Sequence, residues 1–210
     1  MSNIVRIIHP GRKLHEIFLR FQEYYESPEF RGRVFTRKTF DAWYKQSKGT
    51  NYHEDWCGFN LPSNIIDDFR SGDFNPLSPD EQYLLTCCQG LVSPFYVIGV
   101  PTITSVATIK HELGHALYYM NAQYREAVNE ILDQAFALSD RASVEGYLLA
   151  TGYCAEVLTD EIHAYALTGD LPATNLRLRV GVSSLQTQLE TAYDAHYGEI
   201  TFLDFFPQGE

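Results

Sequence analysis

Two histidines and a glutamate near the middle of the chain have the residue types and spacing of a metal site. The stretch HELGH places His111 and His115 four residues apart, with Glu112 next to the first histidine. On a helix, residues four apart lie on one face, so both imidazoles can bind one ion. Glu112 lies about 100° further round the helix, where its carboxylate can take a proton from a water that zinc has acidified. The motif therefore predicts a hydrolase with one Zn²⁺ per chain, His111 and His115 as ligands and Glu112 as general base.

The segments beside this motif must hold it in place. Val106, Ile109, Leu113 and Leu117 recur at helical spacing, so we expect a helix over about 105–120 that is anchored in a core. The preceding segment Pro94–Val100 is rich in β formers and predicts a strand, of the kind that forms an edge strand beside a metal site. Further helices are expected downstream, over 124–138, 143–150, 155–167 and 185–197.

The N-terminal part of the chain supplies the remaining expected elements. A β-branched run over 4–8 predicts a strand, and helices are expected over 11–25, from Thr36, and over 62–69. Ser78, Pro79 and Glu81 form a capping box that begins another helix. Strands are few and early, whereas helices are many and late. The prediction is an α+β fold, predominantly helical, with a small sheet packed on the active-site helix.

Length and composition are those of one compact globular domain over residues 1–210. The chain has 45% hydrophobic and 20% charged residues, which is ordinary for such a domain. Gly72–Ser78 is the candidate internal boundary, because Gly, Asn, Pro and Ser occur together there. It would separate an N-terminal subdomain, 1–75, from a metal-site half, 76–210.

Partners and location follow from charge and from the lack of targeting signals. The formal net charge is −11, which disfavours nucleic acid and anionic membranes as partners. The first residues lack the apolar core of a signal peptide, and no run has the length of a membrane span. We expect a cytoplasmic protein with reduced thiols, or one secreted without a cleavable signal peptide. The four cysteines are interpreted as packed residues.

A third metal ligand must come from elsewhere, because a catalytic zinc usually has three protein ligands and one open position. The acidic residues that follow the motif are the candidates: Glu126, Glu130, Glu145, Glu156, Asp160 and Glu161. A loop at 53–57, with His53, is a further metal or cleft candidate, but a surface loop with a buried Trp56 is the favoured interpretation.

A helix with HELGH after a strand resembles the zincin metallopeptidases. The metzincin motif HExxHxxGxxH would need Gly and His where this chain has Tyr118 and Asn121, so the chain looks like the gluzincins. That resemblance implies a third ligand from a glutamate on a later helix. Glu161, followed by a small residue and an aromatic one, resembles the gluzincin ligand helix, with Glu156 as the alternative. Asp160 could instead support a ligand histidine.

The oxyanion of the reaction also needs a hydrogen-bond donor. Tyr165 lies four residues after Glu161 and shares its helix face, which makes it the first candidate. Tyr153, Tyr119 and His163 are the others. The sequence contains neither the Asn-x-x-x-Glu nor the Glu-x-x-Ala-Asn pattern of two gluzincin groups, so it does not define the subfamily.

Three functions fit these residues. The first is a peptidase acting on a peptide or protein substrate, the second a zinc hydrolase for a small molecule, and the third a binding or regulatory protein that retains the metal helix. Glu112 argues against the third, because binding alone needs no base. An exposed edge strand at Pro94–Val100 would favour a peptide bound as an added strand, and a closed pocket would favour a small ligand.

Overall fold

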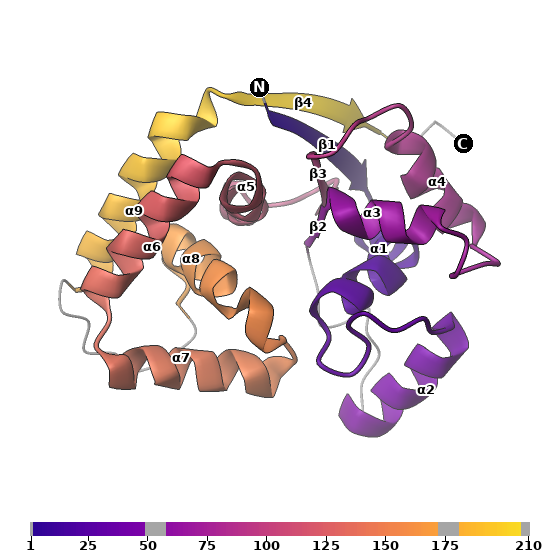
Figure 1. The fold of residues 1–210 in the computed structure, drawn as a ribbon, viewed down its shortest axis with the longest axis horizontal. Helices are drawn as coiled ribbons and strands as arrows, with labels where there is room; N and C mark the ends of the chain where they lie inside the picture. The colour runs from indigo at the N-terminus through magenta and orange to yellow at the C-terminus, as the bar shows by residue number, and fades with distance from the viewer. Residues whose placement is uncertain (1, 49–57, 172–180, 207–210) are drawn as a thin grey trace. The chain divides into compact units, whose positions relative to one another are not determined.

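The computed structural model describes residues 2–48, 58–171 and 181–206. They form a mixed α/β fold, mostly helical, with a four-stranded mixed sheet (Figure 1). The elements in chain order are β1 (Ser2–His9), α1 (Gly11–Glu26), α2 (Arg37–Lys48), β2 (Phe59–Pro62), α3 (Ser63–Arg70), α4 (Pro79–Cys87), β3 (Tyr96–Pro101), α5 (Val106–Met120), α6 (Ala122–Ala135), α7 (Leu138–Thr151), the short 3₁₀ helix η2 (Ala155–Val157), α8 (Leu158–Thr168), α9 (Val182–Tyr197) and β4 (Ile200–Phe205).

The chain divides into two compact units. One contains Ser105–Thr201 and is called the helical unit, because α5 to α9 lie in it. The other contains Asn3–Thr104 and the segment from Phe202, and is called the sheet unit. The change of unit falls at Ser105, just before the helix of the HELGH motif, and the segment Gly72–Ser78 lies inside the sheet unit.

The sheet has the strand order β2-β3-β1-β4. Strand β3 pairs in parallel with β1, from Ile4 opposite Tyr96, and antiparallel with β2, from Phe59 opposite Gly99. The expectation of an edge strand at Pro94–Val100 was therefore wrong. Its five buried residues Tyr96 to Val100 explain why: a strand apolar on both faces is typical of the interior of a sheet, not of its edge.

Helix α1 lies close against this inner strand. A Cβ at Gly99 would lie 2.6 Å from Phe18 Cε2, so only glycine allows the Phe18 ring to approach the β3 backbone. Phe21, Phe69 and Phe74 continue the core as stacked rings, with centroids 3.9 and 3.8 Å apart. These contacts bury the apolar face of α1 that the sequence predicted.

Two short strands were absent from the sequence prediction. Strand β2 lies between the loop expected at 53–57 and the helix expected over 62–69, and β4 follows the last helix. Arg6 on β1 holds Asp204 on β4 in a two-bond ion pair, at 2.9 and 2.7 Å. The expected capping box at Ser78 and Glu81 is confirmed at the start of α4.

In the helical unit the expected helices are present with slightly shifted ends. Ser105 caps α5 through the backbone N–H of Thr108, at 3.0 Å. Asn121 ends α5 and at once caps α6 through the N–H of Tyr124, at 3.0 Å. The chain then returns through α7 and η2 to α8, which packs along α5.

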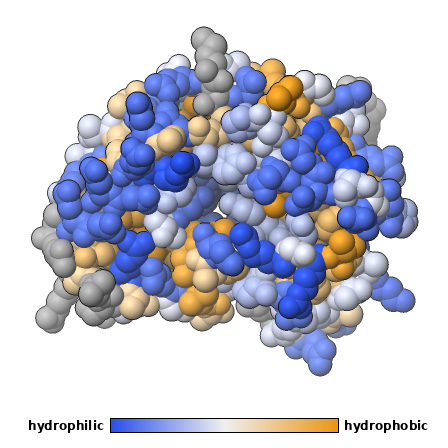
Figure 2. All heavy atoms as spheres, viewed as in Figure 1, coloured by the Kyte–Doolittle hydropathy of each residue, from blue (hydrophilic) through white to orange (hydrophobic). Residues whose placement is uncertain are grey.

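On the face drawn in Figure 2, hydrophilic side chains predominate and hydrophobic ones lie in separate small groups. None of the helices in the described ranges combines the length and apolar character that crossing a membrane requires.

Candidate metal centre

A close helix contact brings α5 and α8 together at the HELGH motif. A Cβ at Gly114 would lie 3.1 Å from Leu167 Cδ2 and 3.2 Å from His163 Cε1, both on α8. That spacing is tighter than ordinary van der Waals contact, so the small residue inside the motif lets the two backbones approach. The contact places the first turn of α8 opposite the two motif histidines.

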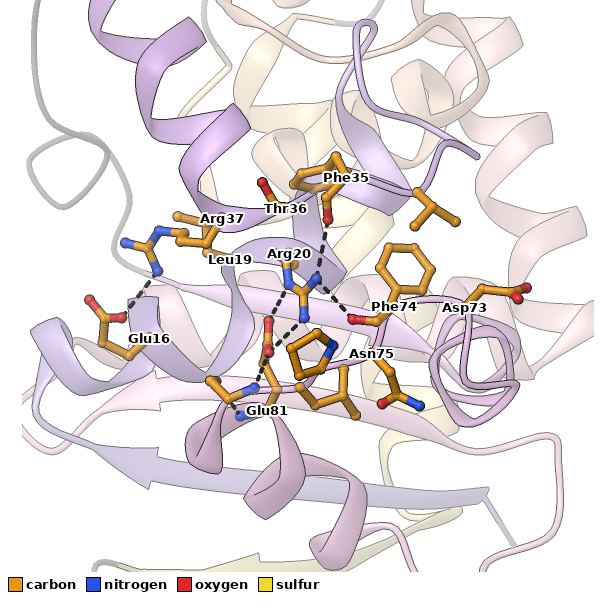
Figure 3. A pocket seen from close by; sticks show the side chains of 14 residues that line it. Glu16, Leu19, Arg20, Phe35, Thr36, Arg37, Asp73, Phe74, Asn75 and Glu81 are labelled. Atoms are coloured by element: carbon orange, nitrogen blue, oxygen red, sulfur yellow. Dashed lines mark hydrogen bonds and ion pairs between the residues drawn. The ribbon is translucent and has the colours of Figure 1, made fainter.

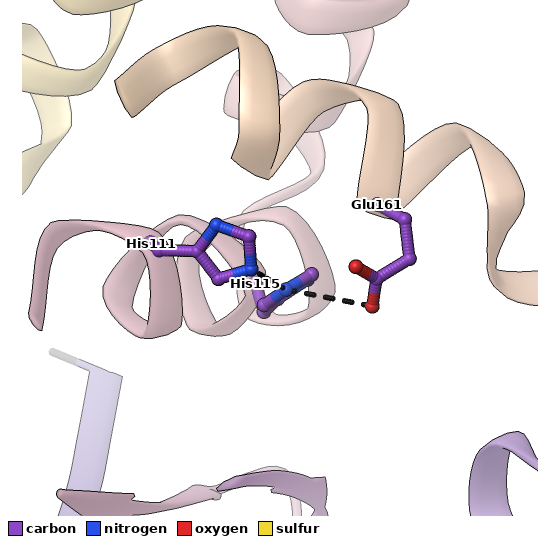
Figure 4. Close-up of side chains that lie close together, drawn as sticks. All are labelled: His111, His115 and Glu161. Atoms are coloured by element: carbon purple, nitrogen blue, oxygen red, sulfur yellow. Dashed lines mark hydrogen bonds and ion pairs between the residues drawn. The ribbon is translucent and has the colours of Figure 1, made fainter. Parts of the chain in front are cut away.

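Three side chains that could hold a metal ion converge there. The donor atoms of His111, His115 and Glu161 all lie within 4.8 Å of one another (Figure 4). His115 Nε2 is 3.2 Å from His111 Nε2 and 3.6 Å from Glu161 Oε1. Two donors bonded to one zinc at about 2.0–2.1 Å in tetrahedral geometry are about 3.3 Å apart. Two of the three donor pairs therefore have nearly the spacing that a shared zinc ion requires, and the third pair, His111 and Glu161, lies within 4.8 Å.

In both motif histidines, a second interaction of the ring fixes its orientation. It leaves the Nε2 atoms of His111 and His115 facing each other. His115 Nδ1 lies 2.9 Å from Asp160 Oδ2. The ring of His111 has a hydrogen bond to the backbone of Ala164 on α8. A carboxylate or carbonyl on Nδ1 keeps the proton there and leaves Nε2 as the metal-binding atom.

Burial gives these groups opposing pKa shifts. Burial lowers the pKa of His111 to about 3, helped by the charge of His115, and raises that of Glu161 to about 8. Burial also acts to lower the pKa of His115, but Asp160 and Glu161 outweigh it and raise that pKa well above its ordinary value. Burial acts to raise the pKa of Asp160, but His115 brings it to about 2. Strongly perturbed titratable groups gathered in one place are typical of functional sites.

Glu112 lies beside the three donors. Its side chain is 5% exposed, and its charge raises the pKa values of both His115 and Glu161. The structure thus keeps a buried carboxylate next to the possible ion, on the same helix as two of its donors.

Two tyrosines complete the surroundings. The Tyr165 ring meets the His111 ring edge to face, with centroids 4.8 Å apart. Its hydroxyl lies 3.2 Å from that of Tyr153, and the Tyr153 side chain hydrogen-bonds to Glu161. Tyr153 is buried whereas Tyr165 is partly exposed. Tyr165 therefore combines contact with a motif histidine and access to solvent.

The other candidates lie elsewhere. Glu126, Glu130 and Glu156 are exposed, and Glu145 is paired with Arg141 at 3.0 Å. His163 is fully buried behind Asp160, and the loop at 53–57 lies outside the described residues. Tyr124, which contacts His163, was not foreseen, because a tyrosine at an apolar position of α6 looks like a core residue.

A separate cavity of about 430 Å³ lies in the sheet unit, between α1, α4 and the segments at 34–37 and 73–78 (Figure 3). Arg20 beside it holds Glu81 at 2.5 and 2.8 Å and donates to the carbonyls of Phe35 and Phe74. Each guanidinium nitrogen already has a protein acceptor, so this charge fixes the local fold.

Comparisons of the chain with protein-family models, with curated proteins and with solved structures give no match in any of the three. The chemistry open to this site therefore follows from the geometry of its own side chains. The structure contains a buried His-His-Glu triad that could hold a metal ion.

Proposed function

We propose that the protein is a zinc-dependent hydrolase, and specifically a peptidase similar to the gluzincins. The observation that carries this proposal is the convergence of three donors: His115 Nε2 lies 3.2 Å from His111 Nε2 and 3.6 Å from Glu161 Oε1, where zinc geometry asks for about 3.3 Å, and all three donors lie within 4.8 Å of one another. Two neutral imidazoles and one carboxylate are a donor set typical of catalytic zinc, with a fourth position left for water.

The three donors would hold one Zn²⁺, which would supply a Lewis acid and make water easier to deprotonate at neutral pH. Glu112 takes the proton from the attacking water and passes it to the leaving group. Its place one residue after His111 keeps it beside the ion without making it a ligand. Its burial also excludes bulk water from the proton it carries.

Tyr165 is the proposed donor to the developing oxyanion. Its contact with His111 places its ring at the triad, and its partial exposure leaves it accessible to a substrate. Tyr153 has a different part, because its bond to Glu161 fixes the orientation of a proposed ligand.

A peptide is the proposed substrate because HELGH resembles the motif of zinc metallopeptidases. Binding as an added strand cannot occur on β3, since both of its sides are paired. The proposal therefore rests on the triad and the motif and assigns no particular strand to substrate binding.

The test is hydrolysis of a mixed peptide library by zinc-loaded protein, read by mass spectrometry, with a panel of simple esters and amides in parallel. The wild type should cleave peptides. Glu112→Gln should retain zinc and lose activity by roughly 10²–10⁴-fold, because only the base is removed. Glu126→Gln, an exposed glutamate on α6, is the matched control and should be fully active.

Tyr165→Phe should retain zinc and lose about 10²-fold in turnover, the usual effect of removing one oxyanion donor. Full activity of Glu112→Gln would overturn the assigned base. Cleavage of the small esters or amides alone would replace the peptidase by a small-molecule hydrolase. Zinc binding without any turnover would favour a binding protein.

A further inference from the structure

Behind the triad lies a second layer of buried polar side chains. His163 on α8 and Tyr124 on α6 are both 0% exposed. His163 Nε2 is 2.7 Å from the Tyr124 hydroxyl, and His163 Nδ1 is 3.5 Å from Asp160 Oδ1. Burying polar side chains is costly unless they are paired. An apolar pair would pack here at lower cost, so these polar residues suggest a role other than packing.

Asp160 links this layer to the triad. One of its carboxylate oxygens faces His115 Nδ1 at 2.9 Å, and the other faces His163 Nδ1. A neutral imidazole carries one donor and one acceptor. With the proton of His163 on Nδ1, that N–H faces Asp160 Oδ1 across 3.5 Å, and Nε2 accepts from the Tyr124 hydroxyl. One continuous chain of polar contacts then runs from Tyr124 through His163 and Asp160 to His115.

The position of the His163 ring is fixed from several sides. It stacks on Tyr118 with centroids 5.6 Å apart and an angle of 23°, and it meets Tyr124 edge to face. Its Cε1 atom also lies against Gly114, in the middle of the motif. A ring that cannot turn gives Asp160 a fixed partner, and a fixed Asp160 gives His115 a fixed orientation.

We propose that His163, supported by Tyr124, is a positioning residue of the metal centre: it holds Asp160 in place and thereby sets the orientation of His115 and the affinity for zinc. The inference rests on the proposed metal site and extends it one layer outwards. Partners behind a ligand histidine typically change metal affinity by about 10–100-fold when they are removed.

The experiment measures the zinc dissociation constant of purified protein by competition with a chromophoric chelator. Asp160→Asn should weaken binding by about 10–100-fold. His163→Phe keeps a ring for Tyr118 and Gly114 but removes both polar atoms, and should weaken binding by about 10-fold. Tyr124→Phe removes one hydroxyl and should have a smaller effect in the same direction. Tyr118→Phe is the matched control, because its hydroxyl bonds to Asn129, and zinc binding should not change.

A second readout separates positioning from general loosening of the fold. Co²⁺ in place of zinc should give an absorption spectrum that is altered in His163→Phe and unaltered in Tyr118→Phe. Wild-type affinity in both His163→Phe and Tyr124→Phe would overturn the inference and leave the proposed function standing. If His163→Phe does not fold, Tyr124→Phe decides alone, and wild-type affinity there overturns the inference. A wild-type protein that binds no zinc would overturn the proposed function as well.

Discussion

Buried charge is treated in two different ways in the two units. In the sheet unit, Arg20 and Glu81 face each other through two hydrogen bonds, and each guanidinium nitrogen has an acceptor. Glu81 also completes the capping box of α4. In the helical unit, the ion pairs of Asp160 and Glu161 are with histidines, and Glu161 Oε2 has no hydrogen-bond partner among the described residues.

We interpret the difference as that between a charge with a structural role and a cluster that could hold a metal ion. A paired and fully hydrogen-bonded guanidinium holds loops together and needs nothing more. A cluster of buried carboxylates and histidines is costly by itself, and the opposing pKa shifts report that cost. A dication at the point where the donors converge would compensate it. We therefore interpret the cluster as built for a metal ion and the Arg20 pair as built for the fold.

Breaking the structural pair should have the largest effect on stability. Glu81→Gln can keep the helix cap but leaves the buried guanidinium without its counter-charge, which should lower the free energy of unfolding by about 3–5 kcal/mol. Asp80→Asn is the control, since the Asp80 ion pair with Lys13 is partly exposed, and it should cost less than about 1 kcal/mol. Urea unfolding measures both. Equal effects of the two variants would contradict the structural role of the buried pair.

The cluster of His111, His115, Asp160 and Glu161 should make the stability of the metal-free protein depend on pH. Between pH 6.5 and about 8, the folded metal-free protein keeps protons on His115 and Glu161 that the unfolded chain has released, because both folded-state pKa values are raised. Unfolding then releases protons, so stability falls as the pH rises through this window. Asp160, with a pKa of about 2, is deprotonated in both states there and contributes no slope. His111 and His163, whose folded-state pKa values burial lowers, oppose the fall near pH 6.5, because the unfolded histidines are still partly protonated there, and this opposition fades towards pH 8.

Zinc takes the place of these protons, so the increase in melting temperature that zinc gives should be larger at pH 8 than at pH 6.5. Thermal unfolding with and without zinc at the two pH values measures it. Glu161→Gln should lose most of the difference. A zinc effect that does not depend on pH in the wild type would contradict the interpretation of the cluster.

A smaller effect is expected at the helix contact that assembles the cluster. Gly114→Ala would place a methyl group 3.1–3.2 Å from Leu167 and His163, and should destabilise the protein by about 1–3 kcal/mol and weaken zinc binding. Gly146→Ala on α7 is the matched control. A Cβ there meets nothing within 4 Å, and alanine should stabilise that helix by up to about 1 kcal/mol. Similar results for the two variants would show that the close approach at Gly114 does not matter.

Local sequence patterns were enough to predict most of the helices, including the helix that carries the HELGH motif. The period of the apolar residues indicates α5, and Ser78, Pro79 and Glu81 define the start of α4. Glu161 was selected from its resemblance to a ligand helix, and the structure brings its carboxylate to the two motif histidines.

Long-range pairing was beyond reach of the sequence. Strand β3 is an inner strand because β2 and β1 flank it. The apolar residues of β3 indicate burial, but they do not identify the strands with which it pairs. The short strand β4 could have been suspected from the β-branched and aromatic residues after α9, but its pairing with β1 depends on the fold. Tyr124 and His163 meet only because α6 and α8 pack together, so their contact has no local signal.

The most direct test of the central claim is X-ray absorption at the zinc edge, on protein loaded with one equivalent of zinc. The account predicts a first shell of four nitrogen and oxygen atoms at about 2.0–2.2 Å, with the outer-shell scattering of two imidazoles and no sulfur. In Glu161→Gln the oxygen contribution from the carboxylate should be lost and the two imidazoles retained. Failure of the protein to bind zinc, or a first shell with fewer than two imidazoles, would contradict the claim that His111, His115 and Glu161 form a metal centre.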